Sequence, residues 1–318
     1  VHYDVFNGDA DGICALVQLR LTNPCEARLI TGAKRDISLL KQVDGKEGDS
    51  VTVLDVSLDK NRDALTRLLN KRVHIHYVDH HFAGEIPQSA LLTTNINTTA
   101  NVCTSLLVNQ ELSNRYIEWA ITGCYGDNLL KTADALGKKT QLSEENRTIY
   151  KTLGTYLNYN GYGASLDDLH FHPGALFKTA SRYHTPQDFI QGDVENFQKL
   201  EAGYRDDFAC TESLAAHYQD RNSKVVILPD APWARRISGV YGNDLANQSP
   251  ELAHAVLTEK ANGNYLVSVR APLNNKTGAD EICGQFPTGG GRKAAAGIND
   301  LDNAELNKFI TTFSNFYR

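Results

Sequence analysis

Three apolar runs of this sequence each end in side chains that can bind a metal ion. The runs read as short β-strands, and open α/β sheets bind ligands at the carboxyl ends of their strands. Carboxylates and imidazole gathered at one sheet edge are what a two-metal phosphoester-cleaving site requires. The side chains concerned are Asp9, Asp11, Asp55, Asp79, His80 and His81.

The spacing of these residues suits a pair of cations. Asp9 and Asp11 stand two apart in a turn flanked by glycines, which lets both carboxylates face one concavity. Asp55 follows a neighbouring strand and can be shared between the ions. The imidazole of His80 favours Mn, Fe or Co over Mg, because nitrogen ligands prefer softer ions. Each motif alone is typical of a turn or a helix cap, but the three together favour a metal site.

The order of the elements indicates an α/β protein with a parallel sheet. Strands are expected at 3–7, 27–31, 51–54 and 73–78, and helices at 13–21, 59–70, 99–110 and 114–122. At 318 residues the chain is long enough for two domains. We expect a catalytic domain at 1–185, a helical linker at 186–222 with one helix from Pro186 to about Tyr218, and a smaller α/β domain at 223–318.

The composition is that of a globular protein, with 41% hydrophobic and 22% charged residues. A formal net charge of −6 suits a short phosphorylated substrate better than a long duplex, whose binding relies on many phosphate contacts. No apolar run approaches the ~18 residues of a membrane span, so we expect a cytoplasmic protein without membrane contact. The six cysteines are scattered and are expected to be mostly buried free thiols.

In their order along the chain, the motifs resemble those of the DHH phosphoesterase superfamily. Asp9-Ala10-Asp11-Gly12 matches its first motif, Asp55 its second, and Asp79-His80-His81 the motif that gives it its name. Gly126-Asp127-Asn128 matches its fourth motif, and 289–297 resembles the glycine-rich segment of the DHH-associated C-terminal domain. The resemblance covers nearly the whole chain. It implies a RecJ-like or oligoribonuclease-type protein with a parallel-sheet DHH domain, a smaller C-terminal α/β domain and an active site in the cleft between them.

The resemblance also implies a role for each matching residue. Two divalent ions are expected, Mn²⁺ first, with Co²⁺ or Mg²⁺ as alternatives. The implied metal ligands are Asp9, Asp11, Asp55, His80 and Asp127, with Asp55 as the bridge. Two catalytic residues complete the set: Asp79 would orient a ligand, and His81 would contact the substrate phosphate.

The glycine-rich segment is expected to bind phosphate. Gly289, Gly290 and Gly291 can expose backbone N–H groups and adopt positive φ. Arg292 and Lys293 would add a bidentate donor and a point charge, ahead of a helix starting at 294–296. Arg270, at the end of an expected strand, is a further phosphate or base contact. A flexible hairpin is the alternative for the three glycines alone.

Two departures from the superfamily pattern stand out. Many members carry a histidine just before the first motif, where this chain has Val5-Phe6-Asn7, and Asn7 offers only a weak amide oxygen. The glycine segment of the superfamily is usually followed by histidine, where this chain has Arg292.

Several residues outside the motifs have two interpretations. Tyr159 and Tyr162 either stack on a base or sit half-buried in a helix-interrupting turn at 158–163. His170 and His172 are expected to be structural or surface groups. The pairs Lys34-Arg35 and Arg235-Arg236 are expected to be solvated, with a place in the lining of the cleft as the alternative.

The leading hypothesis is a metal-dependent phosphodiesterase acting on short single-stranded RNA or DNA oligonucleotides or on linear dinucleotides. One alternative is hydrolysis of phosphoanhydrides, pyrophosphate or polyphosphate, by the same ions. Another is a nucleotide-binding module with a catalytically decayed site. The sequence leaves open whether the protein forms a homodimer.

Overall fold

The computed structural model describes residues 1–318, which form two compact units, Val1–Ala202 and Gly203–Arg318. Each unit contains a β-sheet covered by helices, which confirms the expected α/β class. No helix is both long and apolar enough to cross a membrane. Four of the six cysteines are buried free thiols, while Cys25 and Cys210 are exposed.

The first unit is built on a five-stranded sheet with the order β2-β1-β3-β4-β5, in which every neighbouring pair is parallel. Its strands are β1 (His2–Asn7), β2 (Arg28–Gly32), β3 (Ser50–Leu54), β4 (His74–Asp79) and β5 (Leu92–Ile96). Its helices are α1 (Ala10–Thr22), α2 (Arg62–Asn70), α3 (Thr104–Glu111), α4 (Ile117–Gly126), α5 (Leu130–Lys139), α6 (Glu144–Gly161), α7 (Pro173–Ala180) and α8 (Pro186–Gly192), and α9 (Val194–Ala209) leads into the second unit. Short 3₁₀ turns lie at Leu39–Gln42, Asp59–Asn61 and Leu166–Asp168. The strand β5 was not expected from the sequence.

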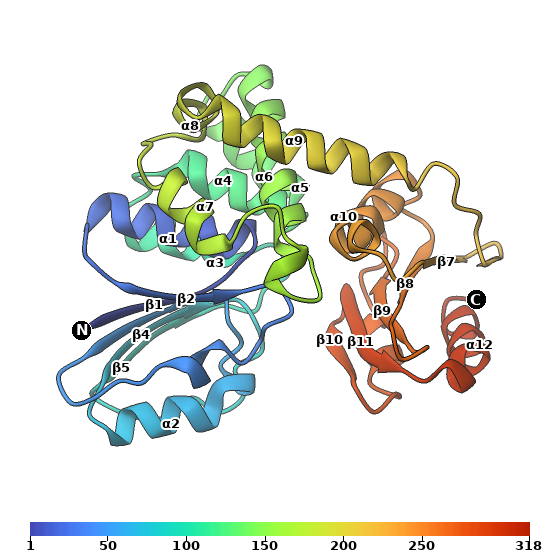
Figure 1. The fold of residues 1–318 in the computed structure, drawn as a ribbon, viewed down its shortest axis with the longest axis horizontal. Coiled ribbons are helices and arrows are strands. Elements are labelled where there is room, and N and C mark those ends of the chain that lie inside the picture. Colours follow the sequence, from blue (N-terminus) through green and yellow to red (C-terminus); the bar gives the residue numbers. More distant parts are fainter. The chain divides into compact units, whose positions relative to one another are not determined.

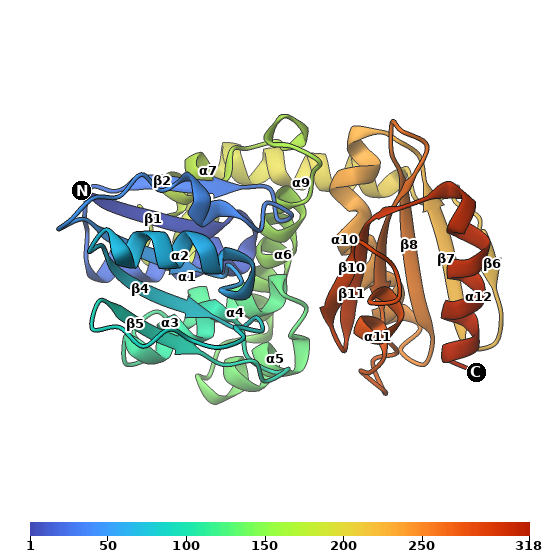
Figure 2. The ribbon, with the colours of Figure 1, turned by 90° about the horizontal axis from the view of Figure 1, so that it is seen from below.

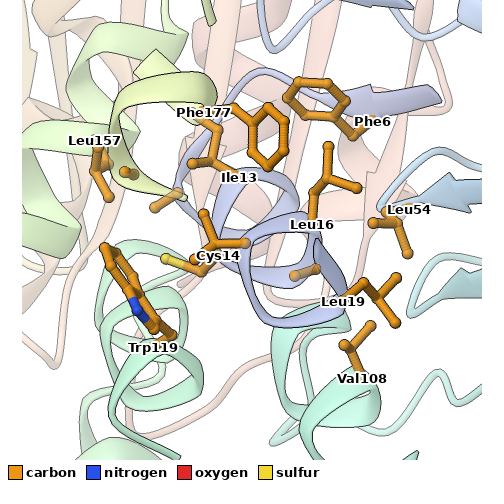
Figure 3. Close-up of a cluster of buried hydrophobic side chains, with 14 of the residues drawn as sticks. Phe6, Ile13, Cys14, Leu16, Leu19, Leu54, Val108, Trp119, Leu157 and Phe177 are labelled. Atoms are coloured by element: carbon orange, nitrogen blue, oxygen red, sulfur yellow. The ribbon is translucent and has the colours of Figure 1, made fainter. Parts of the chain in front are cut away.

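Both faces of this sheet are covered, which explains its nearly continuous apolar strands. Successive side chains of a strand point to opposite faces, so Phe6 and Val5 of β1 enter different cores. Figure 1 shows α1, α3, α4 and α7 on one face and α2 on the other. In Figure 3, Phe6 and Leu54 from the strands face Leu16 of α1, and the Phe6 ring lies 5.7 Å from that of Phe177. Each such buried side chain contributes about 1.5–3 kcal/mol to folding, which fixes α1 on the sheet.

The strand register brings the three chemically interesting strand ends together. Phe6 pairs with Leu54, and Leu54 pairs with Val78, so β1, β3 and β4 end side by side. Because the strands are parallel, the residues that follow them emerge at one edge of the sheet.

Two helical segments differ from the expectation. The single helix expected from Pro186 to about Tyr218 is wrong: α8 ends at Gly192, and Asp193 separates it from α9 and accepts the N–H of Asn196. The helix α9 ends at Ala209, and the boundary between the compact units falls inside it. The linker at 186–222 stays a prediction. The expected interruption at 158–163 is also wrong for its first part, because α6 continues to Gly161.

The second unit contains a six-stranded mixed sheet with the order β10-β11-β9-β8-β7-β6. Only β7 and β8 pair in parallel; the other pairs are antiparallel. Its elements are β6 (Tyr218–Gln219), β7 (Ser223–Leu228), α10 (Pro232–Gln248), β8 (Ala253–Glu259), β9 (Tyr265–Arg270), α11 (Ala279–Cys283), β10 (Gly289–Arg292), β11 (Ala295–Leu301), a 3₁₀ turn at Asn303–Glu305 and α12 (Leu306–Phe316). Within this unit α12 packs along β7 (Figure 2), and α10 packs on β8 and β9.

Candidate active site

The ends of β1 and β3 hold their carboxylates in defined backbone positions. Asp9 is the N-cap of α1, and its Oδ1 accepts the N–H groups of Asp11 and Gly12 at 3.0 and 3.1 Å. Asp55 follows β3 directly and has a φ of +58°, in the left-handed region that non-glycine residues rarely adopt. Such a conformation costs on the order of 1–3 kcal/mol and is typical of functional sites.

Three carboxylates surround one nitrogen of His80. Its Nε2 lies 3.3 Å from Asp55 Oδ1, 3.9 Å from Asp11 Oδ2 and 3.9 Å from Asp127 Oδ2. Asp127 reaches this point from the C-cap of α4, far along the chain from the three strand ends. All four side chains are nearly inaccessible to solvent, with Asp127 the most exposed at 8%. These four are among the five metal ligands expected from the sequence, and the fifth, Asp9, lies near enough for its charge to act on Asp55.

A hydrogen bond of Nδ1 determines which tautomer the neutral His80 ring adopts. Nδ1 lies 2.9 Å from the carbonyl oxygen of Val102, and a carbonyl can only accept, so Nδ1 carries the proton and donates. In the neutral ring Nε2 then keeps its lone pair and directs it at the carboxylates. A hydrogen bond from one ring nitrogen to a backbone carbonyl is the usual way in which a metal-binding histidine is oriented.

Asp11 is oriented by the start of α3. Its Oδ1 accepts the N–H of Ser105, and its Oδ2 accepts the N–H of Thr104, both at 2.7 Å. The Thr104 hydroxyl also donates to Asp55 Oδ1 at 3.3 Å. These contacts fix two of the carboxylates on a buried helix end, so neither has to reorganise to bind a cation. Nothing in the sequence distinguishes Thr104 and Ser105, because their contribution to Asp11 comes from the backbone.

The Asp79 carboxylate pairs with the second histidine of the motif. Its Oδ1 accepts the Nδ1–H of His81 at 2.7 Å, and its buried Oδ2 has no hydrogen-bond partner. Asp79 is fully buried, whereas the His81 side chain is 32% exposed. The rings of His80 and His81 meet edge to face with centroids 4.6 Å apart. The hydrogen bond of Asp79 thus goes to His81, whereas Nδ1 of His80 hydrogen-bonds the Val102 carbonyl.

Burial and like charges shape the ionisation of the cluster. Burial, with Asp9 and Asp11 nearby, raises the pKa of Asp55 well above its ordinary value. Burial also raises the pKa of Asp11, although His80 opposes this. For Asp79, burial opposes ionisation, but the charge and hydrogen bond of His81 keep its pKa below the ordinary value. A bound cation would stabilise the ionised carboxylates of such a cluster, because its positive charge offsets their mutual repulsion.

The donor set fits a divalent metal ion. The ligand atoms of Asp55, His80 and His81 all lie within 4.8 Å of one another. Carboxylate oxygens combined with an imidazole suit Mn²⁺ or a similar transition ion. A second group, His2, Asp4 and Cys25, also has neighbouring ligand atoms, but the Arg20 guanidinium donates to Asp4 there and supplies its positive charge.

Besides Thr104 and Ser105, Lys34 and Asn158 contact the carboxylate cluster without a clear signal in the sequence. Lys34 was expected to be solvated, but its Nζ donates to Asp9 Oδ2 at 2.5 Å and lies 4.0 Å from Asp127 Oδ1. Asn158 Oδ1 accepts a second hydrogen bond from the same ammonium at 3.1 Å. A lysine after a short strand and an asparagine in a tyrosine-rich helix carry no local signal for this role.

The tyrosines near Asn158 do not form a base-stacking platform. Tyr159 is fully buried in α6, and its hydroxyl hydrogen-bonds His170 Nε2 at 2.8 Å. Tyr162 is 8% exposed, and its ring lies 5.4 Å from the Lys34 ammonium. The stacking interpretation is therefore wrong for Tyr159, and so is the half-buried alternative. His172 is structural, as expected, because it accepts the N–H of Gly174 at the start of α7.

The glycine-rich segment of the second unit forms a β-hairpin. Gly289–Arg292 makes β10, which pairs antiparallel with β11, so the helix expected at 294–296 is wrong. Side chains are excluded at two of the glycines. A Cβ on Gly289 would lie 1.7 Å from the Cys283 carbonyl oxygen, and Gly291 has a φ of +146° with Ala296 2.5 Å from such a Cβ. At Gly290 nothing lies within 4 Å of that position, and packing does not require glycine.

The basic residues of this unit differ in their surroundings. Arg292 and Lys293 are exposed at the end of the hairpin. Arg270 is half-buried and donates to Asn243 Oδ1, Ser268 Oγ and the carbonyl oxygens of Val269 and Gly239. These hydrogen bonds hold β9 against α10, and contact between Arg270 and a phosphate stays a prediction.

The arginine pair of α10 also differs from the expectation. The side chain of Arg236 is 14% exposed and pairs with Asp207 at 2.6 Å, so it is not solvated. Arg235 pairs with Asp230 at 2.5 Å.

Comparison with known proteins gives matches among solved structures alone. No protein-family profile and no curated protein sequence matches the chain. The exonuclease RecJ bound to manganese matches with a TM-score of 0.54 and 17% identity, over 99% of this chain and 89% of that one. RecJ from Thermus thermophilus in complex with Mn²⁺ matches with a TM-score of 0.59 and 17% identity. The match includes 99% of this chain but only 52% of that RecJ chain, so this chain spans about half of its length.

A third structure matches over nearly the full length of both chains. The pGpG-specific phosphodiesterase PggH from Vibrio cholerae has a TM-score of 0.57 and 13% identity, over 99% of this chain and 98% of that one. The structural similarity establishes the fold, but at identities this low it does not establish the activity, which has to be argued from the site. The parallel sheet and these structural matches together show that this chain has the fold shared by RecJ and PggH, in agreement with the resemblance to DHH phosphoesterases.

Proposed function

We propose that this protein is a metal-dependent phosphodiesterase that cleaves short oligonucleotides or linear dinucleotides. The observation that carries the proposal is the position of His80 Nε2, which faces Asp55, Asp11 and Asp127 at 3.3–3.9 Å while Nδ1 is tied to a carbonyl. The proposal is supported by the structural matches, since RecJ is an exonuclease solved with manganese and PggH is a pGpG-specific phosphodiesterase.

The four residues Asp11, Asp55, His80 and Asp127 would hold the ion, with Mn²⁺ as the first candidate. When bound, a divalent ion supplies a hydroxide nucleophile and neutralises charge on the phosphoryl oxygens. A two-ion form, as expected from the sequence, additionally needs Asp9 as a ligand of the second ion.

Asp79 and His81 would handle the leaving group. Asp79 accepts the Nδ1–H of His81, which leaves Nε2 to meet the substrate at the exposed side of the ring. When His81 is protonated, its Nε2–H can contact a phosphate oxygen or protonate the leaving oxygen as the P–O bond breaks. The buried Asp79 carboxylate stabilises that imidazolium and fixes its orientation.

The hairpin of the second unit would bind the substrate phosphates. Gly290 leaves the backbone accessible, and Arg292 and Lys293 provide positive charge beside it. Arg292→Ala is then expected mainly to raise KM for an oligonucleotide. An equal fall in kcat with KM unchanged would show that Arg292 acts on the transition state instead.

Hydrolysis of phosphoanhydrides is the second candidate. The burial of Tyr159 favours it, because this residue was one of two candidates for binding a base and cannot do so. A phosphoanhydride hydrolase needs the same carboxylate and imidazole cluster and no base-binding surface.

Turnover measurements separate the candidates. Purified protein is incubated with 5′-labelled di- and pentaribonucleotides and, in parallel, with pyrophosphate, in Mn²⁺, Co²⁺ or Mg²⁺. We expect release of mononucleotides that depends on the metal, is lost in Asp55→Ala and is kept in the matched control Asp63→Ala, an exposed carboxylate of α2. Cleavage of pyrophosphate alone would favour the second candidate. Binding of the oligonucleotide without turnover in any metal would indicate a decayed site.

A further inference from the structure

Lys34 places a positive charge inside the carboxylate cluster. Its ammonium lies 2.5 Å from Asp9 Oδ2 and 4.0 Å from Asp127 Oδ1, and its side chain is only 24% exposed. It approaches the centre from the loop after β2, on the Asp9 side, whereas His80 faces Asp55, Asp11 and Asp127. Asp127 lies close to both groups: its oxygens are 4.0 Å from Lys34 Nζ and 3.9 Å from His80 Nε2.

The protein is built to hold this ammonium in place. The backbone N–H of Lys34 donates to the carbonyl oxygen of Gly161 at 2.7 Å, which fixes the loop on the end of α6. Gly161 also lies directly on Asp9, because a Cβ there would come within 3.0 Å of the Asp9 Cα and Cβ atoms. Only glycine lets α6 approach this closely, so the backbones of Lys34 and Asp9 share one support.

Two further side chains of the same segment surround the ammonium. Asn158 Oδ1 accepts a hydrogen bond from Nζ at 3.1 Å, and the ring of Tyr162 lies 5.4 Å from it. A carboxylate, an amide oxygen and an aromatic ring are a complete environment for a lysine ammonium. This gives Asn158, Gly161 and Tyr162, near the end of α6, a role around Lys34.

Three hydrogen bonds use most of the acceptor capacity of the Asp9 carboxylate. Its Oδ1 caps α1 through two N–H groups, and its Oδ2 takes the Lys34 hydrogen bond. Burial opposes the ionisation of Asp9, but the Lys34 ammonium keeps the pKa of this carboxyl below its ordinary value.

We propose that the Lys34 ammonium takes the place of a second divalent ion beside Asp9, so that the centre binds one divalent ion, at Asp11, Asp55, His80 and Asp127. The inference rests on the proposed metal-dependent function of the same site. A second divalent ion at Asp9 would stand beside the ammonium and be repelled by it. Lys34 provides a fixed positive charge next to the reacting phosphate, where a bound ion would otherwise be required.

The number of bound ions tests this inference without reference to activity. Metal-free protein is titrated with Mn²⁺ in a calorimeter, and the Mn²⁺ retained after desalting is measured by mass spectrometry. Electron paramagnetic resonance distinguishes an isolated Mn²⁺ from a spin-coupled pair. The variants are Lys34→Met, which removes the charge at nearly constant length, Lys34→Arg, which keeps a cation, and the control Lys41→Met at an exposed lysine.

We expect one isolated Mn²⁺ per chain in the wild type, in Lys34→Arg and in Lys41→Met, and two coupled ions in Lys34→Met. Two ions in the wild type would overturn the inference while leaving the metal-dependent function intact, and this outcome does not depend on any variant folding. A single ion in a folded Lys34→Met, shown by an unchanged circular dichroism spectrum, would also overturn it. No ion in the wild type would overturn the proposed function itself.

Discussion

The fully buried Asp79 carboxylate accepts the Nδ1–H of His81 at 2.7 Å, and His81 is the more solvent-exposed histidine of the pair that follows β4. The neighbouring His80 takes its orientation from the Val102 carbonyl instead. Two adjacent histidines therefore have different partners and, in the proposed function, different tasks. His80 would bind the metal ion, and His81 would act on the substrate.

Asp79→Asn is expected to lower kcat by about 10²–10⁴-fold, because an amide can donate to His81 Nδ1 and stabilise the wrong tautomer. Mn²⁺ affinity is expected to change little, because Nδ1 of His80 hydrogen-bonds the Val102 carbonyl, while the hydrogen bond of Asp79 goes to His81. Steady-state kinetics and calorimetric titration with Mn²⁺ measure the two effects separately. Loss of Mn²⁺ binding with the loss of turnover would mean that Asp79 orients a metal ligand, as the sequence suggested.

Asp55→Asn is expected to stabilise the metal-free protein while removing its response to metal. Burial and neighbouring carboxylates raise the pKa of Asp55, so its ionised form opposes folding. An amide removes this conflict, and asparagine tolerates the φ of +58°. A gain of about 1 kcal/mol would raise Tm by roughly 2–4 °C in a unit of this size.

The pH dependence of this gain has a defined sign. A carboxyl with a raised folded-state pKa lowers stability above its unfolded value, so the advantage of Asp55→Asn should shrink as the pH falls toward about 3.9. Thermal melts from pH 4 to pH 8, with and without Mn²⁺, check both effects. A lower Tm of the metal-free variant at pH 7, or an undiminished rise in Tm with Mn²⁺, would contradict the assignment of Asp55.

Asp4→Asn is expected to destabilise the fold without acting on the site. Asp4 is buried and pairs in bidentate fashion with Arg20 at 2.5 and 2.8 Å. Removing one partner of a buried ion pair costs about 3 kcal/mol. Burial would raise the pKa of Asp4, but the hydrogen bonds of Arg20 and His2 keep it below the ordinary value.

The contribution of Asp4 is therefore present above its ordinary pKa and is lost as the pH falls through the lowered folded-state value. Urea unfolding at pH 7 and at pH 3 measures the difference between Asp4→Asn and the wild type. A difference that is as large at low pH as at pH 7, or absent at pH 7, would contradict this interpretation of the ion pair.

Gly290→Ala tests whether the hairpin approaches a phosphate closely. Nothing in the protein lies within 4 Å of an added Cβ at this position, so stability should change by less than about 0.5 kcal/mol. If the Gly290 backbone contacts the substrate, the methyl group should raise KM several-fold. Gly291→Ala serves as the contrasting variant, because its φ of +146° and the nearby Ala296 predict a loss of stability. An unchanged KM in Gly290→Ala would place phosphate binding elsewhere.

The sequence predicted the parts of the fold and site whose positions follow from a local pattern of residues. Apolar runs alternating with helices predict parallel strands, and the residues that follow such strands must share one edge, so the neighbourhood of Asp11, Asp55 and His80 was predictable. Asp127 was found through its resemblance to a motif and not through any property of α4. The resemblance to DHH phosphoesterases is confirmed at the level of the fold.

Long-range convergence was not predictable. Lys34 and Asn158 are 124 positions apart and meet only because α6 packs its last turn on the loop after β2. A hairpin was the alternative interpretation of Gly289–Gly291, but the strand and its pairing with β11 were not expected, because glycine and alanine carry no hydrophobic periodicity and the rest of the sheet decides the pairing.

The most direct test of the metal centre is anomalous X-ray diffraction from crystals soaked in Mn²⁺. The proposed function predicts an anomalous peak for a Mn²⁺ ion that is coordinated by His80 Nε2 and by carboxylate oxygens of Asp11, Asp55 and Asp127. A peak at His2, Asp4 and Cys25 with none at His80, or no peak at saturating Mn²⁺, would contradict it.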